Sequence, residues 1–320
     1  MTWLSYTKAL NRALGDSMAA DDRVCVLGED VGAGLAGPTL GLQGRFGADR
    51  VLDMPLSEQA FTSFAIGASL AGMRPVVEFQ IPSLLFLVFE QIVNQAHKFR
   101  LMTGGQVRVP VTFLVPGSGS RAGWAGQHSD HPYSLFVHSG VKTVVPSMPA
   151  DAYGLLHAAI ADDDPVVVFA PAGAMGIRED LTGPLPPVPL GSARRHLPGT
   201  DVTVVAVGHL VGEALAVARE LADEVSVEVL DPRTLYPFDW DALRESLGRT
   251  GRLVVYDDAN RGCGFAAELL AVAAEESRLL APPLRVTRPD GAVLPFAPAL
   301  DREMQPRPEQ LREALRSVVK

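Results

Sequence analysis

One carboxylate stands where a side chain could act in proton transfer, in the stretch Asp-Met-Pro-Leu-Ser-Glu-Gln-Ala-Phe at residues 53–61. Residues 50–52 have the pattern of a strand, and Phe61 and Ala65 begin an apolar helical pattern, so Glu58 lies at the junction. Ser57 is a suitable N-cap, and acidic residues are favoured in the first turn of a helix. Glu58 is therefore either an ordinary helix-start acid or an acid–base group on a rigid element.

A second group consists of His128, His131 and His138, with Asp130 between them. Imidazole and carboxylate are common metal ligands, but this spacing matches no familiar zinc pattern and no cysteine is nearby. Ordinary loop histidines are one alternative. A single functional histidine at the rim of a cleft is another, because the glycine-rich stretch before it can lie close to a ligand.

Other motifs in the sequence point less directly to a chemical function. Asp162, Asp163 and Asp164 precede Pro165, where they could bind a cation or form a solvated turn. The GAGLAG sequence at residues 32–37 has the letters of a dinucleotide-binding fingerprint, but it is followed by Pro38 instead of opening a helix. No Walker A sequence and no G-x-S-x-G nucleophile elbow occur, so a P-loop ATPase and an α/β-hydrolase are not expected.

Composition narrows the class of protein. The 320 residues are 47% hydrophobic and carry a net charge of -9, which indicates a globular chain and argues against a nucleic-acid partner. Cys25 and Cys263 suggest no disulfide framework, and residues 1–8 contain no signal-peptide core. The longest apolar run, at residues 81–89, is far shorter than the roughly 20 residues of a membrane span. A cytoplasmic protein without a membrane partner is expected.

The elements that must position these side chains alternate between strand and helix. This alternation predicts an α/β fold with a mostly parallel sheet at residues 1–175, a proline-rich linker at 176–200 and a smaller doubly wound domain at 201–320. In the first domain, strands are expected at residues 24–27, 50–52, 74–79, 111–115, 142–145 and 165–169, and helices at 5–18, 61–71, 84–102 and 150–161. In the second, strands are expected at 202–207, 225–230, 252–256 and 284–287, and helices at 213–222, 240–247, 264–276 and 308–319.

Several motifs, taken in order, resemble the beta subunit of the thiamine-diphosphate-dependent 2-oxoacid dehydrogenases, the decarboxylating component of the pyruvate, branched-chain 2-oxoacid and acetoin complexes. In the first domain they are LGEDV at residues 27–31, FGADRV at 46–51, PLSE at 55–58, GMRPVVE at 72–78 and QHS at 127–129. In the second they are DPRTL at 231–235, GRLVV at 251–255, GFAAE at 264–268, PDG at 289–291 and PFA at 295–297. The resemblance covers nearly the whole chain and implies a transketolase-like pyrimidine-binding domain followed by a transketolase C-terminal-like domain.

The resemblance implies that Glu58 hydrogen-bonds the aminopyrimidine of thiamine diphosphate and promotes the tautomer that makes the thiazolium carbon nucleophilic. Such an acid must carry a proton, so burial must outweigh the helix dipole, which favours the anion. His128 is implied to position an incoming lipoyl group and to transfer protons during acyl transfer. The implied cofactor-binding residues are Glu29, Leu56, Glu58, Gln80 and Leu84.

Two departures from the family pattern bear on activity. The family usually has an aromatic residue at the position of Leu84, and a leucine forgoes about 0.5–1.5 kcal/mol of aromatic contact. After His128 the family usually continues Gln-Ser-x-Glu, whereas residues 130–133 are Asp-His-Pro-Tyr. These departures motivate two alternatives, a thiamine enzyme that passes its acyl or acetaldehyde unit to a non-lipoyl acceptor and a non-catalytic structural subunit.

The resemblance also implies partners and ions. The metal and diphosphate site of the family is a Gly-Asp-Gly…Asn signature on the alpha subunit, and this chain has no Gly-Asp-Gly. An alpha partner that supplies the Mg²⁺ site is therefore implied, in a heterotetramer of two alpha and two beta subunits. The second domain resembles the part that docks the lipoyl acyltransferase, with Asp290 as a candidate contact. Potassium is implied at the backbone carbonyls of Val111, Ala159, Asp162 and Asp164.

Overall fold

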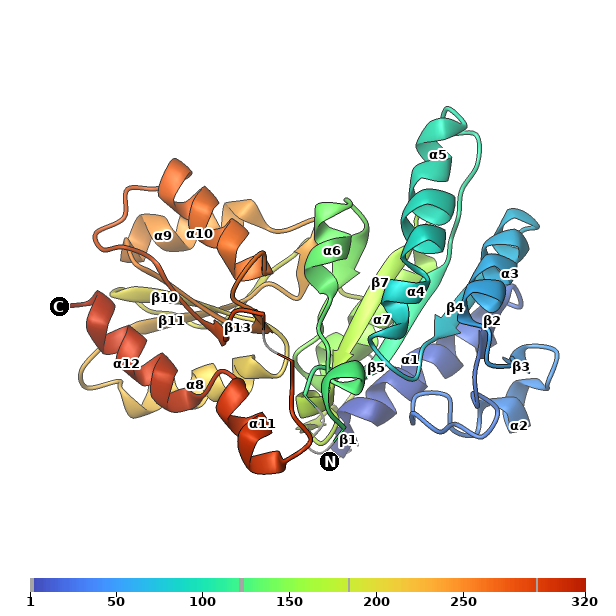
Figure 1. The fold of residues 1–320 in the computed structure, drawn as a ribbon, viewed down its shortest axis with the longest axis horizontal. Coiled ribbons are helices and arrows are strands. Elements are labelled where there is room, and N and C mark those ends of the chain that lie inside the picture. The colour runs from blue at the N-terminus through green and yellow to red at the C-terminus, as the bar shows by residue number, and fades with distance from the viewer. Residues whose placement is uncertain (1–2, 121–123, 184, 292) are drawn as a thin grey trace.

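The computed structural model of this protein describes residues 3–120, 124–183, 185–291 and 293–320. Two larger sheets lie side by side, each flanked by helices, and a third sheet has only two strands (Figure 1). Strands and helices alternate along the chain, and most strand pairs are parallel, as the sequence pattern predicts. No helix in the described ranges is long and apolar enough to cross a membrane.

The larger sheet carries the N-terminal half of the chain. Its seven strands run in the order β12-β6-β7-β5-β4-β2-β3, and only β12 is antiparallel to its neighbour. Near-continuous apolar sequences form its central strands, as expected for a parallel sheet that helices cover on both faces. The strands are β2 (Val24–Gly28), β3 (Val51–Asp53), β4 (Arg74–Glu78), β5 (Thr112–Ser118), β6 (Lys142–Val144), β7 (Val166–Pro171) and β12 (Thr234–Tyr236).

Helices cover the two faces of this sheet. On one face α1 (Tyr6–Ala20) packs against α7 (Pro149–Ala161), and on the other lie α3 (Glu58–Leu70) and the π-helix Gln91–His97. Shorter helices complete this half: α2 (Leu42–Phe46), α4 (Leu84–Leu87), α5 (Lys98–Met102), α6 (Tyr133–His138) and the 3₁₀ turns Gly126–His128 and Ala172–Ala174.

The smaller sheet has the strand order β14-β13-β10-β11-β9, with only β9 antiparallel. Helices α8 and α12 pack on one face and α9 and α10 on the other (Figure 1). The strands are β9 (Arg194–Leu197), β10 (Val202–Ala206), β11 (Val227–Asp231), β13 (Leu253–Asn260) and β14 (Leu284–Arg288). The helices are α8 (Leu210–Glu220), α9 (Trp240–Thr250), α10 (Phe265–Glu276), α11 (Pro298–Met304) and α12 (Pro308–Val318).

The single long helix expected at residues 84–102 is wrong. The structure has α4, then a π-helix over Gln91–His97, then α5. The apolar residues Ile92, Val93 and Ala96 stay buried through this change of helix type. A sequence period cannot distinguish an α-turn from an isolated π-turn, because both keep a similar set of residues on the core side.

The segment expected as a linker carries strands of its own. Within it β8 (Arg178–Asp180) pairs with β1 (Trp3–Ser5), and β9 forms an edge of the smaller sheet. Strand β12, from the C-terminal half, crosses back to the larger sheet. One buried apolar core continues from one sheet to the other, so the halves pack as partners. The boundaries at residues 175 and 200 remain a prediction.

Candidate active site

The carboxyl ends of three neighbouring parallel strands converge on one edge of the larger sheet. Glu29 follows β2, Glu58 begins the helix after β3, and Gln80 follows β4. The side-chain Nε2 of Gln80 donates to the backbone oxygen of Glu29 at 2.8 Å. Ligands of open α/β sheets bind at this edge, where adjacent strand ends leave a crevice. The structure therefore brings together three of the residues that the sequence singled out.

Glu58 is the first residue of α3, and its side chain is nearly enclosed, with 9% of the residue exposed. Among the described residues, no hydrogen-bond donor reaches its carboxylate. Ser57 occupies the N-cap position, but its Oγ donates to the backbone oxygen of Pro55 at 3.0 Å and caps no helix amide. The expected capping by Ser57 is therefore wrong, because the proline carbonyl competes for the hydroxyl. Within the described residues, the Glu58 carboxylate has no hydrogen-bond partner.

Glu29 shares the electrostatic environment of Glu58. Partial burial raises the pKa of Glu29, and the negative charges of Asp30 and Glu58 raise it further. Two carboxylates close enough to affect each other favour a bound hydrogen-bond donor or a proton at this edge.

Two leucines flank the carboxylates. Leu56 is exposed over 75% of its surface, and Leu84 is half-buried against the core. An exposed leucine beside an enclosed carboxylate provides an apolar wall and a hydrogen-bonding group for a planar heterocycle. The packing of Leu84 on a cofactor ring remains a prediction.

The backbone next to His128 is hydrogen-bonded to Ser83, the residue before Leu84. Ser83 donates through Oγ to the backbone oxygen of Gln127 and to Asp130 Oδ2, the latter at 2.8 Å. The imidazole is half-buried and lies 5.7 Å from the Trp124 ring, centroid to centroid. It lines a pocket of about 440 Å³ with apolar walls from Trp124, Ala125, Gly126, Gln127, Val293 and Phe296. His128 is thus open to a ligand.

The other two histidines of the motif are elsewhere. His131 is enclosed between the two halves of the chain, and His138 is exposed at the end of α6. Burial lowers the pKa of His131 to about 4, although the charge of Asp258 opposes that shift. The metal interpretation of this motif is wrong, since the three imidazoles do not converge in the described structure.

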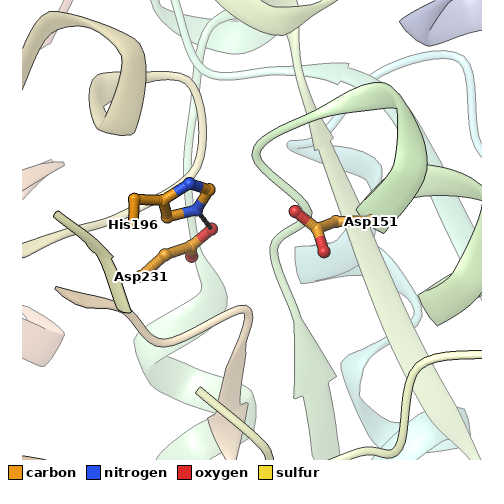
Figure 2. A group of neighbouring side chains, drawn as sticks. All are labelled: Asp151, His196 and Asp231. Carbon is orange, nitrogen blue, oxygen red and sulfur yellow. Dashed lines mark hydrogen bonds and ion pairs between the residues drawn. The ribbon is translucent and has the colours of Figure 1, made fainter. Parts of the chain in front are cut away.

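A different cluster has a donor set of the metal-binding type. Figure 2 shows Asp151 of α7 facing the pair formed by His196 of β9 and Asp231 of β11. His196 Nε2 lies 3.2 Å from Asp231 Oδ2, and Arg233 Nη1 lies 3.1 Å from Asp151 Oδ1. Because the guanidinium already balances Asp151, the cluster is an ion-pair network that joins the two halves of the chain.

The acidic turn at residues 162–164 is covered by basic side chains. Lys142 Nζ lies 2.8 Å from Asp162 Oδ1 and 3.0 Å from Asp164 Oδ2. The backbone oxygens of Val111, Ala159 and Asp162 each accept one hydrogen bond within the protein. A carbonyl oxygen has a second lone pair, so a potassium ion at these oxygens remains a prediction.

The sequence interpretation did not single out Glu78. This residue is the last of β4, at the carboxyl edge of the larger sheet, is fully enclosed, and has an Oε2 that no described group bonds. Within the described residues, its carboxylate accepts one long hydrogen bond, from Thr39 Oγ1 to Oε1 at 3.4 Å. Burial raises the pKa of Glu78 to about 8. The sequence did offer a signal for this residue, because a glutamate ends the buried strand Arg74–Glu78.

Comparison with known families and proteins agrees with this architecture. Residues 3–176 match the family "Transketolase, pyrimidine binding domain", and residues 191–311 match "Transketolase, C-terminal domain". A solved structure described as "Split gene transketolase, inactive beta4 tetramer" superposes with a TM-score of 0.82 and 21% sequence identity, covering 99% of this chain and 98% of that one. At that identity the likeness concerns the fold alone.

Curated relatives are similar along the full length. The beta subunit of 3-methyl-2-oxobutanoate dehydrogenase from Mycobacterium tuberculosis is 42% identical, over 99% of this chain and 92% of the relative. The beta subunit of acetoin:2,6-dichlorophenolindophenol oxidoreductase from Bacillus subtilis is 39% identical, over 96% and 95%. The beta subunit of the pyruvate dehydrogenase E1 component from Leifsonia xyli is 40% identical, over 92% and 88%. The chain therefore belongs to the family of beta subunits of the thiamine-dependent 2-oxoacid dehydrogenases.

Proposed function

We propose that this chain is the beta half of an enzyme that oxidatively decarboxylates a 2-oxoacid, pyruvate or a branched-chain one, and passes the acyl group to the lipoyl group of an acyltransferase. The observation that carries the proposal is the enclosed, unpartnered carboxylate of Glu58 beside the exposed Leu56. A largely buried carboxylate without an internal donor favours a bound ligand that supplies one. The relatives' names support the 2-oxoacid and the multi-component complex.

Thiamine diphosphate, when bound, supplies the nucleophilic carbon that attacks the 2-oxoacid and stabilises the negative charge left after CO₂ departs. Glu58 accepts or shares a proton at the ring nitrogen of the aminopyrimidine. Leu56 and Leu84 would pack on the ring, and Gln80 holds the backbone of Glu29 by a hydrogen bond. His128 orients the acyl acceptor in its apolar pocket.

The chain holds only one end of this cofactor. An alpha subunit is proposed to provide the diphosphate and Mg²⁺ site, in a heterotetramer of two alpha and two beta subunits. Large apolar side chains on or next to α3 and α4 are exposed and suit such an interface, namely those of Leu56, Phe64, Leu70, Phe86 and Leu87. Asp290, exposed just after β14, stays the candidate contact for the acyltransferase.

Reconstitution with the cognate alpha subunit tests the proposal. We expect the pair to release CO₂ from a 2-oxoacid with an artificial electron acceptor, and to acylate an isolated lipoyl domain. A screen across pyruvate, branched-chain 2-oxoacids and acetoin identifies the substrate. Decarboxylation without lipoyl acylation would point to a non-lipoyl acceptor. A reconstituted pair that binds no thiamine diphosphate would contradict the catalytic assignment and favour a structural subunit.

We also predict that potassium stabilises the chain. An ion bound at the carbonyls of Val111, Ala159, Asp162 and Asp164 stabilises only the folded state, by about 1.4 kcal/mol at ten times its Kd. Thermal unfolding in KCl should therefore occur a few degrees above that in choline chloride of equal ionic strength. Equal ionic strength matters because salt screens the contacts of Lys142 with Asp162 in the same way in both solutions. Identical unfolding midpoints in KCl and choline chloride would contradict a potassium site at these carbonyls.

A further inference from the structure

The backbone beside His128 is held by a side chain from the other half of the molecule. Arg288, at the end of β14, donates from Nη1 to the backbone oxygen of Ser129 at 3.0 Å. Arg288 and Ser129 are 2% and 1% exposed. Because Ser129 directly follows His128, the guanidinium holds the carbonyl one residue beyond the imidazole.

Arg288 is itself fixed by a chain of buried polar groups. Its Nε and Nη2 donate to the two carboxylate oxygens of Asp258, at 2.7 and 3.0 Å. Burial alone would raise the pKa of Asp258, but the charge of Arg288 dominates and lowers it to about 2. His131 joins the chain, with Nδ1 3.5 Å from Asp258 Oδ2 and Nε2 3.0 Å from Ser118 Oγ. The network runs from β14 and β13 to the end of β5.

The same segment is held from its opposite side. Ser83 donates to the backbone oxygen of Gln127 and to the Asp130 carboxylate, as described above. The amide of Gly119 donates to the backbone oxygen of Asp130 at 2.9 Å. Residues on both sides of His128 are thus fixed, while its own side chain lines the pocket with Trp124.

We infer that Arg288 is a positioning residue for His128, so that the C-terminal half of the chain sets the geometry of acyl transfer. This inference rests on the proposed function, in which His128 serves the acyl acceptor. Burying an arginine and an aspartate gains little stability over well-packed apolar residues, so stability alone does not explain the pair. The planar guanidinium chelates Asp258 and still has a donor for Ser129, which the ammonium of a lysine cannot reproduce.

The substitution Arg288→Lys tests the inference in the reconstituted alpha–beta complex. It keeps the positive charge beside Asp258 and removes the fork that reaches Ser129. We expect acylation of the lipoyl domain to fall about 10- to 100-fold, as for a misplaced catalytic group, while decarboxylation with an artificial acceptor changes less than about threefold. Arg312→Lys is the matched control, since Arg312 pairs with Glu220 at the surface, and both rates should be kept.

Hydrogen exchange supplies a readout that does not depend on turnover. The peptide spanning residues 124–131 should exchange faster in Arg288→Lys than in the wild type and in Arg312→Lys. Asp258→Asn keeps an oxygen for Arg288 and serves as the second variant if Arg288→Lys does not assemble. An unchanged exchange rate, or equal losses in decarboxylation and acylation, overturns the inference. A wild-type complex without decarboxylation overturns the proposed function instead, and the exchange experiment still tests the contact with Ser129.

Discussion

Replacing Glu58 by glutamine is expected to lower decarboxylation by the reconstituted complex about 10²- to 10⁴-fold, the usual contribution of a positioned acid–base group. The amide has nearly the same shape but cannot exchange a proton with the bound heterocycle. No described group inside the chain bonds the carboxylate, so its removal breaks no internal hydrogen bond. Folding should therefore be kept while activity is lost. The measurement is the rate of CO₂ release, with the thermal midpoint recorded for the same samples.

The matched control for this variant is Glu309→Gln. Glu309 also lies in the first turn of a helix, α12, but it is exposed and far from the sheet edge in sequence and structure. Both substitutions remove a negative charge near a helix N-terminus, which costs about 0.3–1 kcal/mol. Only the Glu58 variant should lose turnover. Normal decarboxylation by Glu58→Gln would disprove its role as the acid–base partner of the cofactor.

The second large effect concerns the stability of the protein as a function of pH. Burial raises the pKa of Glu78 to about 8, from an ordinary value of 4.5. Between these values the folded chain holds a proton that the unfolded chain has released. Stability due to this group is therefore complete below pH 4.5 and is lost as the pH rises towards 8. The expected slope is about 1.4 kcal/mol per pH unit within that window.

Glu78→Gln should remove this slope, because an amide does not ionise. Relative to the wild type, the variant should gain about 3 kcal/mol in the free energy of unfolding between pH 5 and pH 8. If the buried amide destabilises the variant, it lowers the free energy of unfolding by the same amount at every pH. The dependence on pH is then unchanged. Urea unfolding of both proteins at half-unit pH steps measures the difference.

Glu228→Gln is the control for replacing a buried glutamate in a strand by an amide. Glu228 is also enclosed within a strand, β11, but Arg249 Nη2 lies 2.9 Å from its Oε1 and balances its charge. This substitution should leave the slope of the wild type in place over pH 5–8. Parallel stability profiles for the wild type and Glu78→Gln would show that Glu78 is already ionised within the folded sheet.

The sequence alone was sufficient for the family and the fold class. Residue order determines which strands are apolar throughout and which residue follows each strand. The family resemblance implied Glu29, Glu58 and Gln80 as cofactor-binding residues, and the structure places all three at the carboxyl edge of neighbouring parallel strands. The helix after β3 was likewise predictable from a local apolar period and an acidic first turn.

Local sequence patterns did not predict the secondary structure where hydrogen bonds and packing involve segments distant in the chain. The period of residues 84–102 indicated one helix, but packing against the core converts its middle into a π-helix. Residues 176–200 lack periodicity because β8 and β9 are short edge strands whose partners lie elsewhere in the chain. Ser57 lost its capping role to the carbonyl of Pro55, a competition that residue type does not reveal.

The pairings between the two halves of the chain were decided only by the tertiary structure. Arg288 and Ser129 are 159 residues apart, and Asp151 and Arg233 are 82 apart, so no spacing rule joins them. Each forms because docking of the two sheets removes charged groups from water, and a buried charge must find a partner. The sequence thus determined the family and the order of strands and helices. The packing of one sheet against the other determined what holds His128 in place.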